Sequence, residues 1–295
     1  MHRRIPGELI LTIAALIWGT AFVAQTSAAE HLGSLTINGI RSLIAVIVLT
    51  PVIMLRPAID TLQHKRVIKG GAICGILLCV AANLQQYALG MKDAVVGKVS
   101  FLTALYMVLV PVIGMLFGRK TDLKTWISVI IAAAGLYFIT GAQAGGRISA
   151  ADLLSILCAA GFALQILAID HFAPDVDPVR LSRMEFLVCG TLSLILGLIF
   201  EQPRFSDIMA AKWPILYCAV FSSGIAYTFQ MVGQKRCRPQ VASLIMSLES
   251  VFGALSGMII LKERLSLFEI TGCVLMSAAV VLTQINIKPK VDAVK

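Results

Sequence analysis

Residues 67–90 read VIKGGAICGILLCVAANLQQYALG, a run in which Lys69 is the one charged residue. A helix needs roughly 20 mainly apolar residues to cross the hydrocarbon core of a bilayer. This run is long and apolar enough to do so. Asn83 and Gln86, near its end, are polar side chains that must find hydrogen-bond partners inside a membrane. The stretch therefore predicts a transmembrane helix that packs in a larger bundle.

The whole chain has the composition of an integral membrane protein. Its 295 residues are 58% hydrophobic and 14% charged, whereas soluble domains are about 45–50% apolar and about 25% charged. The formal net charge of +9 could indicate nucleic acid as a partner. However, the lysines and arginines form short clusters between apolar runs, with no basic face that carries interleaved aromatics. We therefore expect a lipid bilayer as the partner and no nucleic acid.

Charged or Pro/Gly-rich breaks divide the chain into ten apolar runs of about the length of a membrane span. They predict an all-α integral membrane protein with ten transmembrane helices, near residues 8–29, 36–55, 67–90, 95–117, 123–141, 151–172, 178–200, 212–235, 239–261 and 266–285.

The loops between these runs differ in charge according to the side on which they fall. If every run crosses the membrane, 17 lysines and arginines fall on one side and 7 on the other. Cytoplasmic loops carry the excess of positive charge in most membrane proteins. We therefore expect a multi-pass protein of the plasma (cytoplasmic) membrane with both termini in the cytoplasm.

An internal repeat has a single register along the chain, a shift of 144 residues that pairs Gln86 with Gln230. The same shift superimposes the first predicted helix on the sixth, and so on to the fifth on the tenth. Because each copy would cross the membrane an odd number of times, the second copy must be inverted. We predict two inverted five-helix repeats, at 1–143 and 144–290. Such halves place a substrate site near the midplane and can expose it to each side in turn.

Four stretches carry a resemblance to a known family: residues 14–19 (AALIWG), 101–106 (FLTALY) with Pro111 after them, 227–230 (YTFQ) with Gln234 and Pro239 after them, and 262–265 (KERL). Over nearly its full length the chain resembles the EamA-type members of the drug/metabolite transporter superfamily. The resemblance implies secondary transport, commonly export, of metabolites, amino acids or drugs, without fixing a substrate. The family often has Glu-Pro in its ninth helix, where this chain has Glu249-Ser250, which puts a proline kink there in doubt.

Glu249 is the charged residue placed deepest in a predicted span, about ten residues into the ninth helix. A charged side chain at that depth costs roughly 2.5–3.5 kcal/mol, so its presence indicates a function. We expect Glu249 to bind a cationic group of the substrate or a proton. The alternative, a buried glutamate hydrogen-bonded to a neighbouring helix as a packing contact, stays open.

Arg41 and Glu185 occupy equivalent positions in the two repeats, each about two turns from a helix end. Long side chains at such a depth can reach the membrane interface with their charged groups. We expect both to do so, and we keep Arg41 as a candidate substrate-binding residue.

Uncharged polar and aromatic side chains form a wider set of candidates, because they must face the bundle interior or a wet cavity. The set is Trp18, Asn38, Asn83, Gln86, Tyr87, Thr103, Tyr106, Gln165, Tyr227, Gln230 and Gln234. From it we select Trp18, Asn83, Gln86, Tyr106, Tyr227 and Gln230 as substrate-binding residues. Interhelical hydrogen bonding, worth roughly 0.6 kcal/mol on average, is the alternative account of many of them.

Three other functions compete with that of a transporter of small-molecule substrates. An enzyme is not expected, because the four histidines lie in or beside loops and no His-Glu-x-x-His motif exists. The seven cysteines show no paired metal-ligand spacing, so no metal or cofactor is expected either. A scaffold or receptor would need a soluble domain, and every loop is short. A pore-type facilitator or channel for small polar solutes stays open, as does a homo-oligomer.

Overall fold

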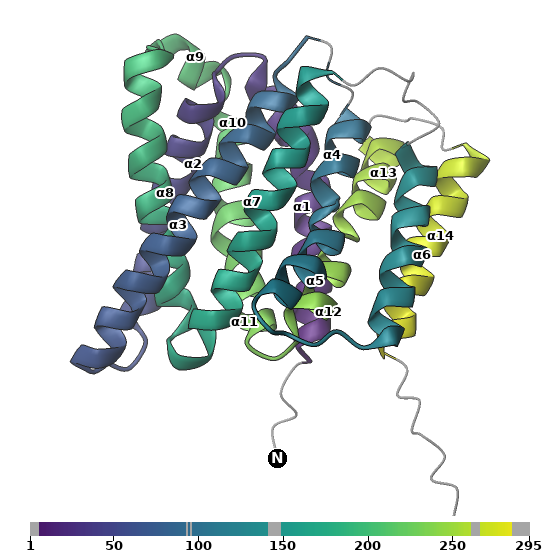
Figure 1. Ribbon diagram of the computed structural model, residues 1–295. Coiled ribbons are helices and arrows are strands. Elements are labelled where there is room, and N and C mark those ends of the chain that lie inside the picture. The colour runs from purple at the N-terminus through teal and green to yellow at the C-terminus, as the bar shows by residue number, and fades with distance from the viewer. Residues whose placement is uncertain (1–5, 93, 95, 141–148, 261–265, 285–295) are drawn as a thin grey trace, which may run out of the picture.

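The computed structural model describes residues 6–92, 94, 96–140, 149–260 and 266–284. Every regular element in these ranges is a helix and none is a strand, which confirms the all-α fold class (Figure 1). The stretch 262–265, part of the family resemblance, lies outside the described residues, as do both termini.

Most of the described helices lie within the predicted apolar runs, whereas η2 and α9 lie between them. They are α1 (Gly7–Ala29), α2 (Ser34–Met54), α3 (Thr61–Leu89), α4 (Val96–Ala104), α5 (Tyr106–Leu116), α6 (Leu123–Thr140), α7 (Ala150–Phe172), η2 (Ala173–Asp175), α8 (Pro178–Phe200), α9 (Phe205–Ala210), α10 (Lys212–Tyr217), η3 (Cys218–Tyr227), α11 (Thr228–Gln234), α12 (Pro239–Met246), α13 (Glu249–Ile260) and α14 (Leu267–Gln284).

Six stretches of the described chain are long and apolar enough to cross a membrane. They are Gly7–Ala29, Ser34–Met54, Thr61–Leu89, Ala150–Asp175, Pro178–Phe200 and Lys212–Gln234. Shorter apolar helices cover Leu102–Leu116, Leu123–Phe138 and Leu267–Thr283. The protein is therefore a multi-pass membrane protein.

Two of the predicted runs are interrupted, and a third changes its helical geometry. The run 95–117 contains α4 and α5, which meet at Leu105, and the run 239–261 contains α12 and α13. The run 212–235 changes at its centre to η3, a π-helix that joins α10 to α11 without a break. Such π-helical segments are rare and occur frequently at functional sites.

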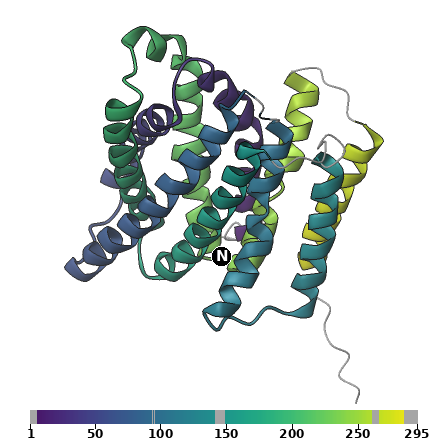
Figure 2. The ribbon, with the colours of Figure 1, turned by 45° about the horizontal axis from the view of Figure 1, so that its top comes forward.

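Helices from the two halves of the chain pack against each other throughout the bundle. The helix α2 packs on α8, α3 on α7 and α8, and α1 on α13, α11 and η3. The helices α6 and α14 lie side by side at one edge, away from α2 and α8 (Figures 1 and 2). The core therefore depends on contacts between the halves.

A glycine permits the close approach of α3 to α8. A Cβ atom at Gly75 would lie 2.6 Å from the Glu185 carbonyl oxygen and 2.8 Å from Val188 Cβ. Real Cβ atoms do not come so near, so only glycine allows this spacing. The contact brings the backbone of α8 at Glu185 against α3.

Ion pairs join the two halves at the end of the bundle where α1 begins and α14 ends (Figure 1). Arg56, after α2, pairs with Asp177 at 2.6 Å, and Arg119, after α5, pairs with Asp170. All four side chains are partly exposed, and exposed pairs contribute only about 0–1 kcal/mol each. They therefore add little to the stability of this end.

At the opposite end, Glu201 caps α2 from the loop after α8. Its carboxylate accepts hydrogen bonds from the backbone N–H groups of Leu35 and Thr36, at 2.9 and 2.8 Å, and from Thr36 Oγ1 at 2.7 Å. A negative charge at a helix N-terminus is favourable because the first N–H groups lack partners within the helix.

We expect Glu201→Ala to destabilise the fold by about 1–2 kcal/mol, the range for loss of a charged N-terminal cap. The measurement is the thermal denaturation midpoint of the purified protein in detergent, which should fall. Glu30→Ala, which changes an exposed carboxylate at the end of α1, is the matched control. Equal midpoints for the two variants would contradict the role of Glu201.

Candidate functional site

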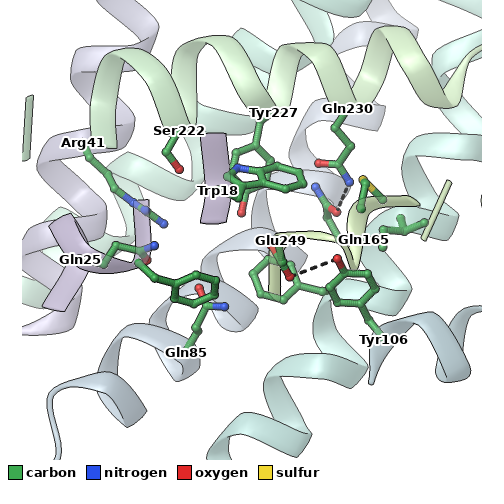
Figure 3. A pocket seen from close by; sticks show the side chains of 14 residues that line it. Trp18, Gln25, Arg41, Gln85, Tyr106, Gln165, Ser222, Tyr227, Gln230 and Glu249 are labelled. Atoms are coloured by element: carbon green, nitrogen blue, oxygen red, sulfur yellow. Dashed lines mark hydrogen bonds between the residues drawn. The ribbon is translucent and has the colours of Figure 1, made fainter. Parts of the chain in front are cut away.

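A pocket lies inside the bundle, where helices of the first half of the chain meet helices of the second (Figure 3). Its lining residues are Trp18, Phe22, Gln25, Arg41, Gln85, Tyr106, Phe162, Gln165, Ile166, Ser222, Tyr227, Gln230, Met246 and Glu249. The volume of the cavity is about 40 Å³, and a single water needs about 10–15 Å³. The pocket therefore has room for a few waters, and it must widen to admit a metabolite.

Aromatic rings form one wall of the pocket. The ring of Trp18 on α1 meets that of Tyr227 on η3 edge-on, with centroids 4.8 Å apart. Tyr106 on α5 and Phe162 on α7 make a similar pair at 6.4 Å. Edge-to-face pairs of this kind are worth about 0.5–1.5 kcal/mol beyond the area they bury. They fix the shape of the wall and offer ring faces to a bound cation or apolar group.

Glu249 is the one carboxylate among the lining residues that the structure describes. It is 6% exposed and accepts a hydrogen bond from the Tyr106 hydroxyl at 3.1 Å. Both residues begin a helix immediately after an interruption, Tyr106 in α5 and Glu249 in α13. The interruptions therefore bring a phenol from the first half and a carboxyl from the second together at the pocket (Figure 3).

Arg41 on α2 is the one cationic side chain among the described lining residues. It is only 4% exposed. Among the described residues, its Nε has no hydrogen-bond partner and no carboxylate forms an ion pair with it. The expectation that Arg41 extends to the membrane interface is therefore wrong, because α2 turns this side chain into the bundle. Its positive charge lies at the pocket, beside the Cys218 thiol of η3.

A chain of hydrogen bonds leads from the pocket to a second buried carboxyl group. Gln230 Nε2 donates to Gln165 Oε1 at 3.1 Å, and Gln165 Nε2 donates to Glu185 Oε1 at 2.8 Å. Glu185 is 0% exposed. The expectation that Glu185 reaches the interface is also wrong, because α8 turns its side chain toward α7.

Polar atoms without hydrogen-bond partners gather at the pocket. They include Trp18 Nε1, Gln25 Oε1, Arg41 Nε and Gln230 Oε1, all on lining residues. A buried polar atom left without a partner costs about 1–3 kcal/mol. The pocket is therefore built for polar contents, either water or the polar groups of a ligand.

Two of the predicted site residues, Asn83 and Gln86, do not line this pocket. The Asn83 side chain accepts from Asn38 Nδ2 at 3.0 Å and donates to Ser193 Oγ at 2.8 Å, which ties α3 to α2 and α8. Gln86 donates to the backbone carbonyl of Gln25 at 3.1 Å and so fixes α3 on α1. Interhelical hydrogen bonding, the alternative considered from the sequence, describes these contacts.

The pocket also contains polar residues that the sequence analysis missed. Gln25 follows Trp18 by two helical turns on the same face of α1, a spacing that could have indicated it. Gln85 lines the pocket while its neighbour Gln86 does not, and two adjacent amides give no signal to distinguish them. Ser222 lies in η3, whose π-helical geometry shifts the register of side chains along the run.

A multi-pass bundle whose halves enclose a polar, aromatic-lined pocket has the architecture of a membrane transport protein. The chain belongs to the EamA-like transporter family, whose model matches it twice, over residues 5–141 and 149–285.

Relatives over nearly the full length carry consistent names. An "Uncharacterized transporter" of Archaeoglobus fulgidus is 26% identical, covering 97% of this chain and 88% of that protein. The "Uncharacterized inner membrane transporter YedA" of Escherichia coli K12 is 25% identical, with 92% and 88% covered. The "Uncharacterized transporter YvbV" of Bacillus subtilis is 26% identical, with 96% and 92% covered.

A solved structure shares the fold. It superimposes with a TM-score of 0.73 at 18% sequence identity and covers 94% of this chain and 96% of that one. The likeness extends over both halves, so the arrangement of helices around the pocket occurs in another protein of low sequence identity.

Proposed function

We propose that the protein is a secondary transporter that exports small metabolites, amino acids or drugs across the cytoplasmic membrane by alternating access. The substrate binds in the central pocket, where Glu249, Arg41, Gln230 and the aromatic wall contact it. Ten transmembrane helices, as two inverted repeats at 1–143 and 144–290, form the transport unit.

The observation that carries the proposal is the hydrogen bond between Tyr106 and Glu249, 3.1 Å long. It joins the two halves at the points where α4–α5 and α12–α13 are interrupted. Under the shift of 144 residues, Leu105 at the first interruption corresponds to Glu249 at the second. Interrupted helices at equivalent positions of two inverted repeats are where such transporters bind substrate.

The arrangement of the helix ends supports ten crossings and a common side for the termini. The start of α1 and the end of α14 lie at the same end of the bundle, and successive long helices alternate in direction (Figure 1). Arg56, Arg119 and Lys235 lie in the connections at that end. By the positive-inside rule, this end faces the cytoplasm.

The charges in the pocket support a particular chemistry of substrate. Glu249 offers a negative group and Arg41 a positive one, and both are buried. A ligand that carries both an ammonium and a carboxylate satisfies both, whereas a purely anionic ligand leaves Glu249 opposed to it. We therefore favour zwitterionic or cationic substrates.

The size of the pocket supports a conformational change during transport. It has room for a few waters only, so the halves must move apart for a metabolite to enter. The ion pairs Arg56–Asp177 and Arg119–Asp170 cross between the halves at the basic end, and their partial exposure lets them break at little cost. In the transport cycle they separate when the pocket opens to that side.

A counterflow assay tests the proposal, with the purified protein in liposomes preloaded with unlabelled amino acids or cationic drugs. We expect transient accumulation of the matching labelled compound inside, with a rate that saturates as its concentration rises. Protein-free liposomes and mismatched preloads are the controls. Flux that neither saturates nor shows counterflow would instead favour a pore-type facilitator or channel, the alternative function.

A further inference from the structure

Glu185 is a carboxyl group that lies behind the pocket wall. It is fully buried, and its Oε2 has no hydrogen-bond partner among the described residues. No described lysine or arginine forms an ion pair with it. The titratable side chains that face it are Cys74 on α3 and Tyr227 on η3, while α7 presents the neutral Gln165. The cation nearest in the pocket is Arg41 of α2, which interacts electrostatically with Tyr227 and with Cys189, one turn along α8 from Glu185.

The two hydrogen bonds that connect the pocket to Glu185 have the same direction. In each of them the donor is on the pocket side and the acceptor is on the Glu185 side. Gln230 donates to Gln165, and Gln165 donates to Glu185 (Figure 3 shows the first of these bonds). An ionised carboxylate can only accept hydrogen bonds, so this direction suits the ionised form. In the ionised form, Gln230 Oε1 has no hydrogen-bond partner among the described residues and stands at the pocket as a free acceptor.

The protonated form of Glu185 requires the opposite direction. Its O–H is a donor, and Gln165 Oε1 is an acceptor that can come within reach if the Gln165 amide turns over. Gln165 Nε2 then donates to Gln230 Oε1, to which no other group in the described part of the chain donates. Half-turns of two amide groups complete this change without movement of the backbone. Gln230 is left with its amide N–H₂ group, a donor, toward the pocket.

We propose that Glu185 is a proton-binding site coupled to the pocket through Gln165 and Gln230, so that binding a proton changes Gln230 from a hydrogen-bond acceptor to a donor. The proton comes from, and returns to, solvent that reaches the open pocket. The inference rests on the proposed function in that the pocket binds the substrate. Because linkage is reciprocal, ligands that accept a hydrogen bond from Gln230 bind more tightly when Glu185 is protonated. Ligands that donate one bind more tightly when it is ionised.

Infrared difference spectroscopy during a pH titration tests this on the full chain in lipid bilayers, without any substrate. We expect a carboxyl C=O band whose intensity changes with pH, present in the wild type and in Glu249→Gln but absent in Glu185→Gln. The titration depends on no transport, so a failure of the proposed function and a failure of this inference are distinguishable. A carboxyl spectrum that Glu185→Gln leaves unchanged at every pH would overturn the proposal.

A double-mutant cycle tests the coupling itself. Gln230→Leu removes the pocket end of the chain and should displace the titration midpoint of the Glu185 band by about one pH unit, the effect of about one hydrogen bond. In a Gln165→Leu background the same change should have no further effect, because the connection is already lost. Gln234→Leu is the matched control, a buried amide one turn further along α11 that bonds to the Ile166 carbonyl instead. Equal effects of Gln230→Leu in both backgrounds, or none in either, would overturn the coupling.

Discussion

Replacing Glu249 with glutamine is expected to lower the counterflow rate at subsaturating substrate about twofold to thirtyfold. Glutamine keeps the size of the side chain and can still accept the hydrogen bond from Tyr106, but it carries no negative charge. A hydrogen bond to a charged group is worth about 1.5–3 kcal/mol, against about 1 kcal/mol between neutral groups. Since each 1.4 kcal/mol is about a factor of ten, loss of the charge should weaken binding of a cationic group to that extent.

The comparison requires equal amounts of folded protein in the liposomes and a variant that changes a carboxylate elsewhere. Glu30→Gln serves this purpose, because Glu30 is exposed at the end of α1 and does not line the pocket. It should transport like the wild type. If Glu249→Gln retained the affinity, rate and pH dependence of the wild type, Glu249 would have only a packing role.

Replacing Gly19 with alanine is expected to separate α1 from α13 and to destabilise the fold by about 1–3 kcal/mol, the usual cost of overpacking. A Cβ at Gly19 would lie 2.6 Å from Phe252 Cβ, 2.7 Å from Gly253 N and 2.8 Å from the Glu249 carbonyl oxygen. Backbone atoms cannot yield as a flexible side chain can. Because Trp18 and Glu249 stand at this contact, transport should decrease together with the thermal denaturation midpoint.

Gly253→Ala is the matched control, on the other side of the same helix contact. A Cβ there would lie 3.8 Å from the Gly19 carbonyl oxygen and 4.0 Å from Phe22 Cδ2, which are ordinary contact distances. We therefore expect stability and transport close to those of the wild type. Equal behaviour of the two alanine variants would contradict the close contact between α1 and α13.

The sequence was sufficient to predict where the helices lie, because apolar runs interrupted by charges and by Pro or Gly leave little choice in a membrane. It did not predict the interruptions inside the runs. Neither Leu105 nor the pair Ser247 and Leu248, between α12 and α13, includes a glycine or a proline, so nothing local marks a break. The second interruption occurs although Ser250 stands where the family often has proline. Contacts between helices, which a single sequence does not display, must stabilise both.

The candidate site was predictable in part, for a related reason. Depth along a helix indicates that Glu249 is far from water, and the structure places it at the pocket. Depth does not tell which way a side chain turns, so the expectation that Arg41 and Glu185 reach the interface failed. Neighbouring polar residues raise the same difficulty, since Gln85 lines the pocket and Asn83 binds other helices.

Access to the pocket from each side of the membrane tests alternating access most directly. Ser222 lines the pocket and is 1% exposed, so Ser222→Cys would place a thiol there with little change in size. The background would have Cys237 and Cys273, the two less buried cysteines, replaced by alanine. A membrane-impermeant thiol reagent would be added to one side of the liposomes at a time. We predict reaction from either side, reduced by any compound that shows counterflow; reaction from one side only would contradict alternating access.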